Sequence, residues 1–442
     1  MEVILIKGAQ LILSLSLLVI IHEFGHFIFA RAFKTRVEKF YLFFDPWFSL
    51  FKVKKGETEY GVGWLPLGGY VKISGMIDES MDKEAMKLPP QPHEFRSKKS
   101  WQRLLIMIGG VLMNFILAFI IYIGVLFAWG ETYIPTANVK YGIEVDSVGI
   151  QIGLQNGDKI LSVDNNPVEN FRKVIPTVIL DKAQAIQVER NGQKVDVEIS
   201  DEDLALLIKS KGVITYRIPF NYTVASFAKN SAAKEAGIKA GDQILGMDSL
   251  KFEYNDQFRT ALRERVGKTI SLQVLRDGKE SNISMVVPQS AALGIALDLN
   301  LEKLFELKTI EYSLFESIPA GFERGISTIN DYLKQFKLIF SPKTKAYESL
   351  GGFIAIGNIF PGAWNWFDFW NMTAFLSIIL GVMNLLPIPA LDGGHVIFLL
   401  FEMVTGRKPG EKFLEYAQIA GMVLLLSLVL YANGNDIFKL FK

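Results

Sequence analysis

Two histidines and a glutamate lie close together near the start of the chain, inside a run that is otherwise apolar. In the segment His22-Glu23-Phe24-Gly25-His26 three residues separate the two histidines. At this spacing both imidazoles project from one face of a helix and can reach the same metal ion. Glu23 follows at about 100° around the helix, where its carboxylate could take a proton from water without binding the ion. This pattern is typical of zinc-dependent hydrolysis, and the alternative is a polar contact between helices.

A zinc site of this kind requires a third protein ligand, and two aspartates are candidates. The chain contains no cysteine, which excludes thiolate ligands. Asp45 follows His26 by 19 residues, a spacing that resembles that of soluble zinc peptidases. Asp392 lies in an apolar segment after two prolines, and irregular backbone at membrane depth is tolerated only where protein or a wet cavity covers it. Because Asp392 is expected at the same depth as the two histidines, we predict that it, and not Asp45, completes the ligand set.

The composition indicates that these groups belong to a membrane protein. Of 442 residues, 50% are hydrophobic and 33 are phenylalanine, which is too apolar for an ordinary soluble chain of several domains. About 20 apolar residues are needed to cross a bilayer. We therefore predict a polytopic α-helical protein with four transmembrane segments, at residues 1–33, 104–129, 367–401 and 413–432. A cleaved signal peptide is a weaker alternative for the first segment, which lacks a strongly basic start and an Ala-x-Ala site.

The distribution of charge predicts both orientation and partners. Basic residues flank one end of the predicted segments: Arg31, Lys34, Arg36, Arg96, Lys98, Lys99, Arg103, Arg407, Lys408 and Lys412. By the positive-inside rule these ends are cytoplasmic, which makes residues 34–103 a cytoplasmic loop and places both termini and the long segment after residue 130 outside. The metal site then lies near the cytoplasmic side. The chain carries 47 basic and 46 acidic residues, so its net charge gives no indication of a nucleic-acid partner.

The segment between the second and third transmembrane segments contains an internal repeat. The matching pieces are Gly153-Leu-Gln-Asn-Gly-Asp-Lys-Ile-Leu161 with Gly237-Ile-Lys-Ala-Gly-Asp-Gln-Ile-Leu245, and Val188-Glu-Arg-Asn-Gly-Gln193 with Val274-Leu-Arg-Asp-Gly-Lys279. Each copy predicts a Gly-Asp turn, a short strand, a helix, and two strands joined by an Asn-Gly or Asp-Gly turn. The copies, residues 139–215 and 217–288, resemble PDZ domains, which bind an extended peptide or a chain terminus. The alternative is a pair of generic small β-rich modules.

Taken together, the motifs resemble those of the site-2 protease family of intramembrane zinc metalloproteases. The motifs are the His22–His26 segment, Gly109-Gly110-Val-Leu-Met-Asn114, the tandem PDZ-like copies and Asn384-Leu-Leu-Pro-Ile-Pro-Ala-Leu-Asp-Gly-Gly394. The resemblance covers nearly the whole chain. It implies one zinc ion per chain with three ligands, which are His22, His26 and Asp392. It further implies that Glu23 is the catalytic carboxylate and that Asn384 and Asn114 contact the substrate, although hydrogen bonding between helices is an alternative for both asparagines.

Cleavage of a membrane-spanning helix requires local unwinding, and the freed main-chain groups then need partners. Residues 58–74 have strand-like stretches on both sides of the turn at 66–69, and predict a β-hairpin that enters the membrane and offers its edge to the substrate. The residues assigned to this contact are Gly68, Gly69, Tyr70, Val71, Lys72 and Ile73. The alternative is a solvated cytoplasmic hairpin. Residues 289–366 are predicted as a linker with amphipathic helices, or with a plain linker helix in place of the one at 310–340.

The family resemblance implies a protease in the bacterial cytoplasmic membrane. We expect single-pass membrane proteins as substrates, such as an anti-sigma factor already shortened by another protease, together with remnant signal peptides. Other expected contacts are the lipid bilayer and a peptide or chain terminus at the PDZ-like copies. A metal-binding transporter and an inactive PDZ scaffold are alternatives, disfavoured by the absence of an inverted hydropathy repeat and by the intact motifs. His395 and His93 are predicted to be a packing residue and a solvated loop residue.

Overall fold

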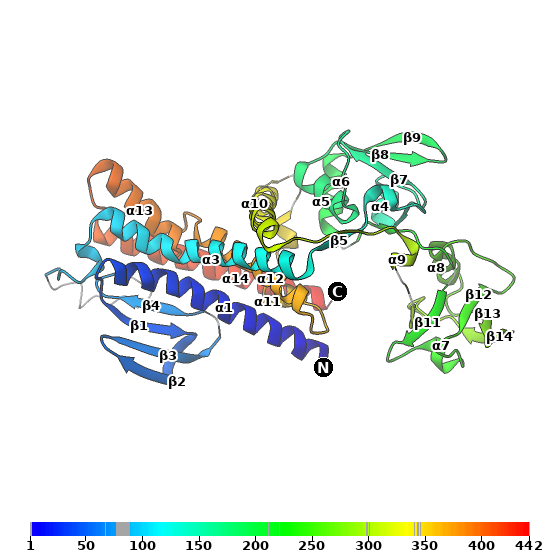
Figure 1. Ribbon diagram of the computed structural model, residues 1–442, viewed down its shortest axis with the longest axis horizontal. Helices are drawn as coiled ribbons and strands as arrows, with labels where there is room; N and C mark the ends of the chain where they lie inside the picture. Colours follow the sequence, from blue (N-terminus) through cyan, green and yellow to red (C-terminus); the bar gives the residue numbers. More distant parts are fainter. Residues whose placement is uncertain are drawn as a thin grey trace. The chain divides into compact units, whose positions relative to one another are not determined.

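The computed structural model describes the chain as two compact units (Figure 1). The described residues are 2–66, 68–76, 89–210, 212–220, 222–297, 299, 301–339, 341–342, 344 and 346–441. The helical unit comprises Met1–Gly130, Glu311–Phe336 and Tyr347–Lys442, and the repeat unit comprises Glu131–Ile310 and Lys337–Ala346. In the sequence, the repeat unit is therefore an insertion into the helical unit.

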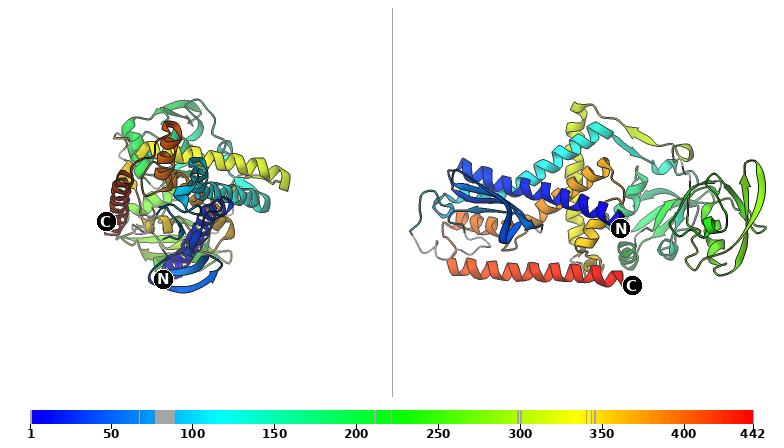
Figure 2. Two further views of the ribbon diagram at one scale, coloured as in Figure 1. Left: turned by 90° about the vertical axis from the view of Figure 1, so that its left-hand side faces the viewer. Right: turned by 90° about the horizontal axis from the view of Figure 1, so that it is seen from below.

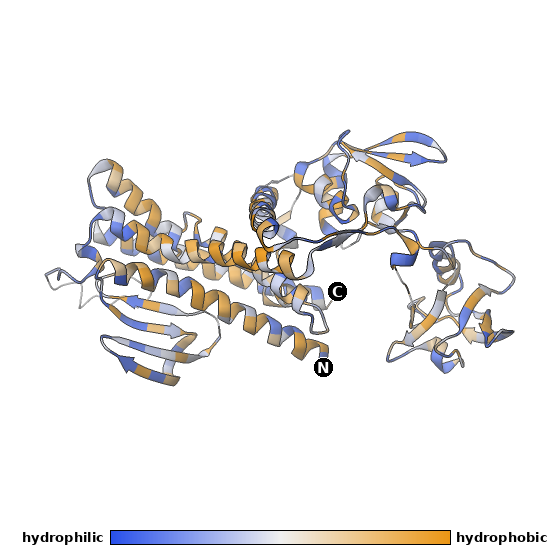
Figure 3. Ribbon diagram, viewed as in Figure 1, coloured by the Kyte–Doolittle hydropathy of each residue, from blue (hydrophilic) through white to orange (hydrophobic). Residues whose placement is uncertain are grey.

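Among the described residues, four helices of the helical unit are long and apolar enough to cross a membrane, which agrees with the predicted number of spans. They are α1 (Glu2–Ala32), α3 (Ser100–Trp129), α12 (Trp366–Asn384) and α14 (Glu411–Leu440). Their surfaces are predominantly apolar (Figure 3), and in the right-hand view of Figure 2 α1, in dark blue, and α3, in cyan, cross each other. Helices α1 and α3 approach closely because Gly25 faces Gly109, where an added Cβ atom would lie 2.2 Å from the Gly109 carbonyl oxygen. This contact fixes the helix that carries the two histidines.

The predicted third transmembrane segment, residues 367–401, is divided in the structure. Helix α12 ends at Asn384, and α13 (Asp392–Thr405) begins only after the loop 385–391. The two prolines of this loop have no N–H, so a continuous helix would lack a hydrogen bond at each of these positions. Gly393 packs directly on the loop, since an added Cβ atom would lie 2.2 Å from the carbonyl oxygen of Leu386. Asp392 therefore lies at the start of a helix and not inside a span.

Further helices follow the repeat unit in the sequence, before α12. These are α10 (Leu314–Ile339), the 3-10 helix η4 (Ala346–Ser349) and α11 (Phe353–Asn358). Helix α10 occupies the region predicted as an amphipathic helix at residues 310–340. It packs on α3 where Gly321 meets Ile123 and Gly325 meets the ring of Phe119.

A four-stranded sheet follows α1, in the order β2-β3-β1-β4. Its strands are β1 (Val37–Leu42), β2 (Phe44–Lys55), β3 (Thr58–Leu65) and β4 (Tyr70–Ile73), and η1 (Phe95–Ser97) lies between the sheet and α3 in the chain. The strands expected in residues 58–74 are present, but they do not pair with each other as a hairpin. Strand β1 lies between them, parallel to β3 and antiparallel to β4. The central place suits β1, which carries the buried side chains of Val37 and Tyr41, and it leaves β4 as an edge strand. Leu67, within the predicted hairpin, lies outside the described residues.

The repeat unit contains two apolar cores, one for each copy of the repeat. The first copy consists of β6 (Ile143–Val145), α4 (Ser147–Gln151), β7 (Lys159–Val163), η3 (Phe171–Lys173), α5 (Val174–Asp181), β8 (Ala185–Arg190), β9 (Gln193–Glu198), α6 (Asp201–Lys209) and β10 (Ile214–Tyr216). The second consists of β11 (Tyr222–Phe227), α7 (Ala232–Glu235), β12 (Gln243–Met247), α8 (Asn255–Arg263), β13 (Thr269–Arg276), β14 (Lys279–Val286) and β15 (Ile295–Leu297). The remaining elements are β5 (Glu131–Tyr133), η2 (Thr136–Asn138), α9 (Leu301–Leu304) and β16 (Lys308–Ile310). Strand β15 pairs with β11, so the second copy extends beyond residue 288.

Both copies have the predicted strand, helix and two-stranded hairpin, and both use the repeated motif in the same way. The hairpin turns have positive φ at Asn191 and Asp277, each followed by a glycine with positive φ. The aspartate of each Gly-Asp turn is buried and binds the arginine of the following hairpin. The pairs are Asp158 with Arg190 and Asp242 with Arg276, and each arginine also donates to the carbonyl of the first glycine of its motif. The repeat therefore preserves a structural ion pair.

Candidate functional site

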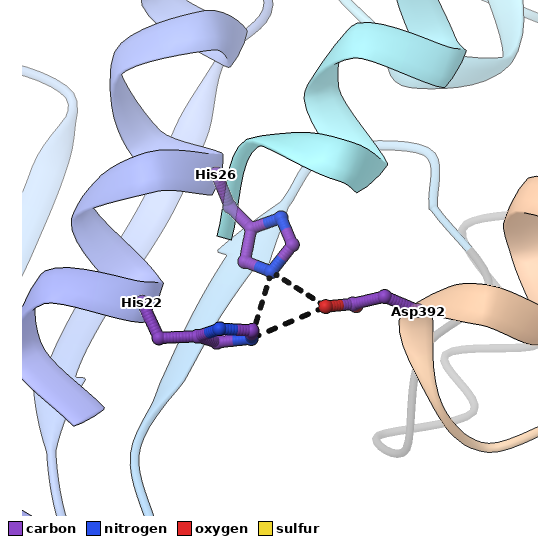
Figure 4. Close-up of side chains that lie close together, drawn as sticks. All are labelled: His22, His26 and Asp392. Atoms are coloured by element: carbon purple, nitrogen blue, oxygen red, sulfur yellow. Dashed lines mark hydrogen bonds and ion pairs between the residues drawn. The ribbon is translucent and has the colours of Figure 1, made fainter. Parts of the chain in front are cut away.

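Two histidines of α1 and the first residue of α13 meet inside the helical unit (Figure 4). Asp392 Oδ2 lies 3.2 Å from His22 Nε2 and 3.3 Å from His26 Nε2, and the two Nε2 atoms are 3.3 Å apart. All three side chains are mostly buried. Residues that are separated by some 370 positions in the sequence thus direct one potential ligand atom each at the same point.

The hydrogen bond of His26 Nδ1 determines the protonation of Nε2, the nitrogen that faces Asp392 and His22. His26 Nδ1 lies 2.8 Å from the main-chain carbonyl oxygen of Ile106 in α3. A carbonyl can only accept, so Nδ1 carries the proton and donates it. The neutral ring then has a lone pair on Nε2, directed at Asp392 and His22. This is the tautomer that a metal ligand requires.

Asn114 of α3 contacts Nδ1 of His22, as the Ile106 carbonyl contacts Nδ1 of His26. Its side-chain amide is 3.1 Å from His22 Nδ1, and its Oδ1 atom is buried without a hydrogen-bond partner among the described residues. The oxygen and nitrogen of an asparagine amide exchange places on a 180° rotation. In the rotated form Oδ1 accepts the proton of His22 Nδ1, which leaves the lone pair on Nε2 as in His26. Asn114 can therefore set the tautomer of His22.

The environment of Asp392 shows that this group suits a cation. Its Oδ2 atom is buried close to both imidazoles, yet it accepts no well-directed hydrogen bond from any described residue. A buried carboxylate oxygen without a donor is costly, and two imidazole lone pairs beside it would add repulsion. One carboxylate and two imidazoles are a ligand set that zinc accepts. The three residues therefore fit the zinc ion that the sequence predicts.

Gly110 of α3 allows these atoms to converge. A Cβ atom at this position would lie 2.5 Å from His26 Nε2 and 2.8 Å from His22 Nε2. Any side chain would thus occupy the place where the potential ligand atoms meet. The Gly-Gly pair was visible in the sequence, but its role was not, because it depends on how closely α3 packs against α1.

Glu23 lies in the same cavity as the three potential ligands. The main-chain N–H of Val71 in β4 lies close to the carboxylate of Glu23. Gly69 is also close, since an added Cβ atom there would lie 3.6 Å from Glu23 Cγ. The sheet thus reaches the side chain that the sequence predicts as catalytic.

The cavity, about 720 Å³ in volume, brings together most of the residues predicted to contact substrate. Those that line it are Gly68, Gly69, Tyr70, Val71, Lys72, Ile73 and Asn384. Asn384 Nδ2 lies 3.4 Å from His22 Nε2. Asn114 is fully buried behind His22 and is not part of the lining. Its position thus favours holding His22 over touching substrate.

Main-chain directions along β4 alternate between β1 and the cavity. The N–H of Ser74 donates to the Arg36 carbonyl beside β1, so the even-numbered residues of β4 face that strand. The N–H groups of Val71 and Ile73 therefore face away from β1, and that of Val71 reaches Glu23. The free edge of β4 is thus turned toward Glu23.

The remaining predicted candidates lie elsewhere or lack a defined role. Asp45 is outside the ligand group, and its carboxylate accepts hydrogen bonds from Ser49 and Tyr70. Burial, followed by the Asp45 carboxylate, raises the pKa of Tyr70. His395 lines the cavity, whereas His93 is not part of its lining. The sequence analysis overlooked Gln418, a cavity residue that was visible as a polar exception within an apolar helix.

Comparison with known proteins extends over nearly the whole chain. The model of Peptidase family M50 matches residues 10–428. The chain is 28% identical to the regulator of sigma E protease of Haemophilus influenzae, over 97% of this chain and 98% of the relative. It is 27% identical to the regulator of sigma-E protease RseP of Escherichia coli, over 98% of each chain. A protein of Fusobacterium nucleatum whose name places it among the zinc metalloproteases is 30% identical, again over 98% of each chain.

Proposed function

The chain belongs to peptidase family M50 and is an intramembrane zinc metalloprotease, and on this premise we propose which residues carry out the reaction and on what substrate. His22, His26 and Asp392 hold the zinc ion, and Glu23 is the catalytic carboxylate. The single observation that carries this assignment is the convergence of two imidazole nitrogens and one donor-less carboxylate oxygen in a cavity that also contains Glu23.

We assign a role in the reaction to each residue from its position in the site. A zinc ion bound there supplies a Lewis acid, which polarises a peptide carbonyl and makes water a stronger acid. Glu23 is placed to take a proton from the attacking water and deliver it to the departing amine. The Val71 N–H lies close to the Glu23 carboxylate, while the Ile106 carbonyl and Asn114 keep the two imidazoles in the required tautomer. Asn384, close to His22 Nε2, is a donor for the substrate carbonyl.

The edge of β4 binds the substrate as an added strand. A helix must unwind before its amides can be cut, and each unpaired amide in a dry environment costs several kcal/mol, roughly. The free edge of β4 supplies main-chain partners for an extended segment beside Glu23. Gly69 allows the backbone that leads into β4 to come close to α1, because an added Cβ atom there would lie 2.6 Å from Val19 Cγ1.

A proline scan tests this edge. Proline at Ile73, whose N–H faces away from β1, should lower the cleavage rate of a transmembrane substrate about tenfold with zinc content unchanged. Alanine at Ile73 also removes a buried side chain but retains the N–H, so folded protein should lose much less cleavage than the proline variant. Lys72→Pro is the matched control, because the N–H that it removes faces β1 and not the cavity. This variant should destabilise the sheet. Equal cleavage by the Ile73→Pro variant and the wild type would show that substrate does not pair with β4.

The substrates are the membrane-spanning segments of single-pass proteins. Relatives with the name regulator of sigma-E protease suggest an anti-sigma factor, and remnant signal peptides are also membrane-spanning segments. We place the enzyme in the bacterial cytoplasmic membrane, with both termini and the repeat unit outside, because basic residues flank the opposite ends of the spans.

The two repeat copies act as PDZ-like recognition modules that bind a peptide or chain terminus and exclude bulky substrates. They carry none of the residues assigned to chemistry, and their strand, helix and hairpin order is that expected for such modules. A chain without residues 139–297 should cleave two forms of a substrate at similar rates, one already shortened by another protease (trimmed) and one of full length (untrimmed). Loss of cleavage of a trimmed substrate, in an otherwise folded enzyme, would exclude this filter.

The catalytic assignment is tested with a purified transmembrane substrate reconstituted with the enzyme in lipid vesicles. The Glu23→Gln variant should retain one zinc ion per chain and lose at least 1,000-fold in kcat, roughly, since it keeps the shape but not the proton acceptor. Loss of zinc from this variant, or retained cleavage, would contradict the role proposed for Glu23.

A further inference from the structure

A glutamine of the last long helix faces the catalytic cavity without a partner. Gln418 of α14 is 6% exposed and lines the cavity that contains Glu23 and Asp392. Among the described residues, none forms a hydrogen bond with its side chain. Its neighbours in the sequence differ, because Tyr416 and Ile419 are exposed on the apolar outer surface of α14. Gln418 thus belongs to the inward face of a helix that is otherwise mostly exposed.

The residue is mostly buried, but its amide atoms are not among the fully buried polar atoms without a partner, so the amide opens onto the cavity and a substrate that fills the cavity has to pair with it. A primary amide taken out of water without a hydrogen bond costs about 1–3 kcal/mol by protein mutational data. Buried side-chain amides are almost always paired for that reason. The orientation of Gln418 toward a cavity, and not toward a neighbouring helix, indicates that its partner enters the cavity.

A close contact one helical turn away fixes the position of Gln418. Gly421 packs against the loop 385–391, where an added Cβ atom would lie 1.4 Å from the carbonyl oxygen of Pro389. Only glycine permits this approach of α14 to the backbone that leads into Asp392. The contact therefore anchors the inward face of α14, including Gln418, beside the chain segment that ends at the metal group.

The two sides of the cavity differ in the groups that they offer to an extended substrate. The free edge of β4 can pair with only one edge of an added strand. Apart from the groups already assigned, the lining from α1, α11 and α12 is apolar and consists of Leu15, Val19, Phe353 and Leu380. A primary amide has a donor and an acceptor, as a peptide group does, and can bond one residue on the opposite edge of the strand.

We propose that Gln418 binds the main chain of the unwound substrate and is a substrate-binding residue for cleavage. The inference rests on the proposed function, because it assumes that the substrate occupies the cavity beside Glu23. It assigns α14 a direct role in binding substrate. It also predicts that the substrate is held from both edges, by β4 on one and by Gln418 on the other.

The test compares kinetic constants of the full chain in lipid vesicles with a synthetic transmembrane peptide that the wild type cleaves. Gln418→Leu retains the approximate volume and removes both the donor and the acceptor. It should raise KM about tenfold while kcat and zinc content stay within twofold of the wild type. Ser427→Leu, a polar-to-apolar change at an exposed position of the same helix, should leave all three unchanged.

Ester substitution in the peptide identifies the contact. Replacing one substrate amide at a time by an ester removes a single N–H and weakens its carbonyl as an acceptor. In the wild type, one position near the cleaved bond should show a loss that disappears in the Gln418→Leu variant. An identical ester profile in both enzymes would overturn the proposal, as would a fall in zinc content or kcat without a rise in KM. Retained cleavage by Glu23→Gln would contradict the proposed function instead, so the two failures are distinguishable.

Discussion

Two buried clusters of charge differ in whether their atoms have partners. In the repeat unit, the Asp158 carboxylate accepts two hydrogen bonds from Arg190 and one from the Gln155 main chain, and Asp242 makes the same set. In the helical unit, Asp392 Oδ2 lies between two imidazoles without a directed hydrogen bond. Satisfied networks stabilise a fold, whereas converging groups that lack donors require an ion. Motifs of similar length thus have a structural role in one region and a chemical role in the other.

The largest effect that this comparison predicts concerns Asp392. Asp392→Asn replaces an anionic ligand by a neutral amide, so zinc should be lost from the purified protein and cleavage should fall below detection. Asp45→Asn is the matched control, because its carboxylate bonds only Ser49 and Tyr70 and should keep full zinc. Elemental analysis and a cleavage assay measure both. The opposite pattern of zinc loss would make Asp45 the ligand.

Asn114 should have an intermediate effect, because it acts through His22. Asn114→Ala removes the partner of His22 Nδ1 and should weaken zinc affinity about 10–100-fold, as measured by competition with a chelator. Asn114→Asp retains an acceptor for the same proton and should recover part of the affinity. Ser377→Ala is the control, since its hydroxyl donates only to the Asn114 main chain. Equal zinc affinity in the wild type and Asn114→Ala would exclude the positioning role.

The structural ion pairs should affect stability and not chemistry. Asp158→Ala and Asp242→Ala each remove a buried acceptor of arginine hydrogen bonds, at a cost of about 2–3 kcal/mol in the stability of the copy concerned. Hydrogen exchange should increase within residues 143–216 for the first variant and within 222–297 for the second. Zinc content should remain that of the wild type. A loss of zinc in either variant would contradict the division between the two clusters.

The smallest effect is a dependence on pH in the second copy. The hydrogen bonds from Arg276 lower the pKa of Asp242 below its ordinary value. A lowered folded-state pKa gives stability above about pH 4, which is lost as the pH falls through the folded-state value. The hydrogen-exchange protection factors of residues 222–297 should therefore fall on acidification below pH 4, roughly, and less steeply in Asp242→Asn. Equal slopes for the two proteins would remove Asp242 from the pH response.

The sequence predicted the features that depend on local patterns. The four spans follow from apolar length, the hairpin turns from Asn-Gly and Asp-Gly, and the meeting of His22, His26 and Asp392 from shared membrane depth. The insertion of β1 between β3 and β4 could not be predicted, because parallel pairing is decided by distant contacts such as the burial of Tyr41. The roles of Ile106 and Gly110 also depend on how α3 packs against α1, which no local pattern encodes.

X-ray absorption at the zinc edge tests the central claim most directly. The chain contains four histidines, so the number of imidazole ligands distinguishes between possible sites. The account predicts one zinc ion per chain with two imidazole ligands in the wild type, and an unchanged spectrum in a His395→Ala variant. Three imidazole ligands, or a spectrum that changes in His395→Ala, would contradict the assignment of His22, His26 and Asp392 as the complete set of protein ligands.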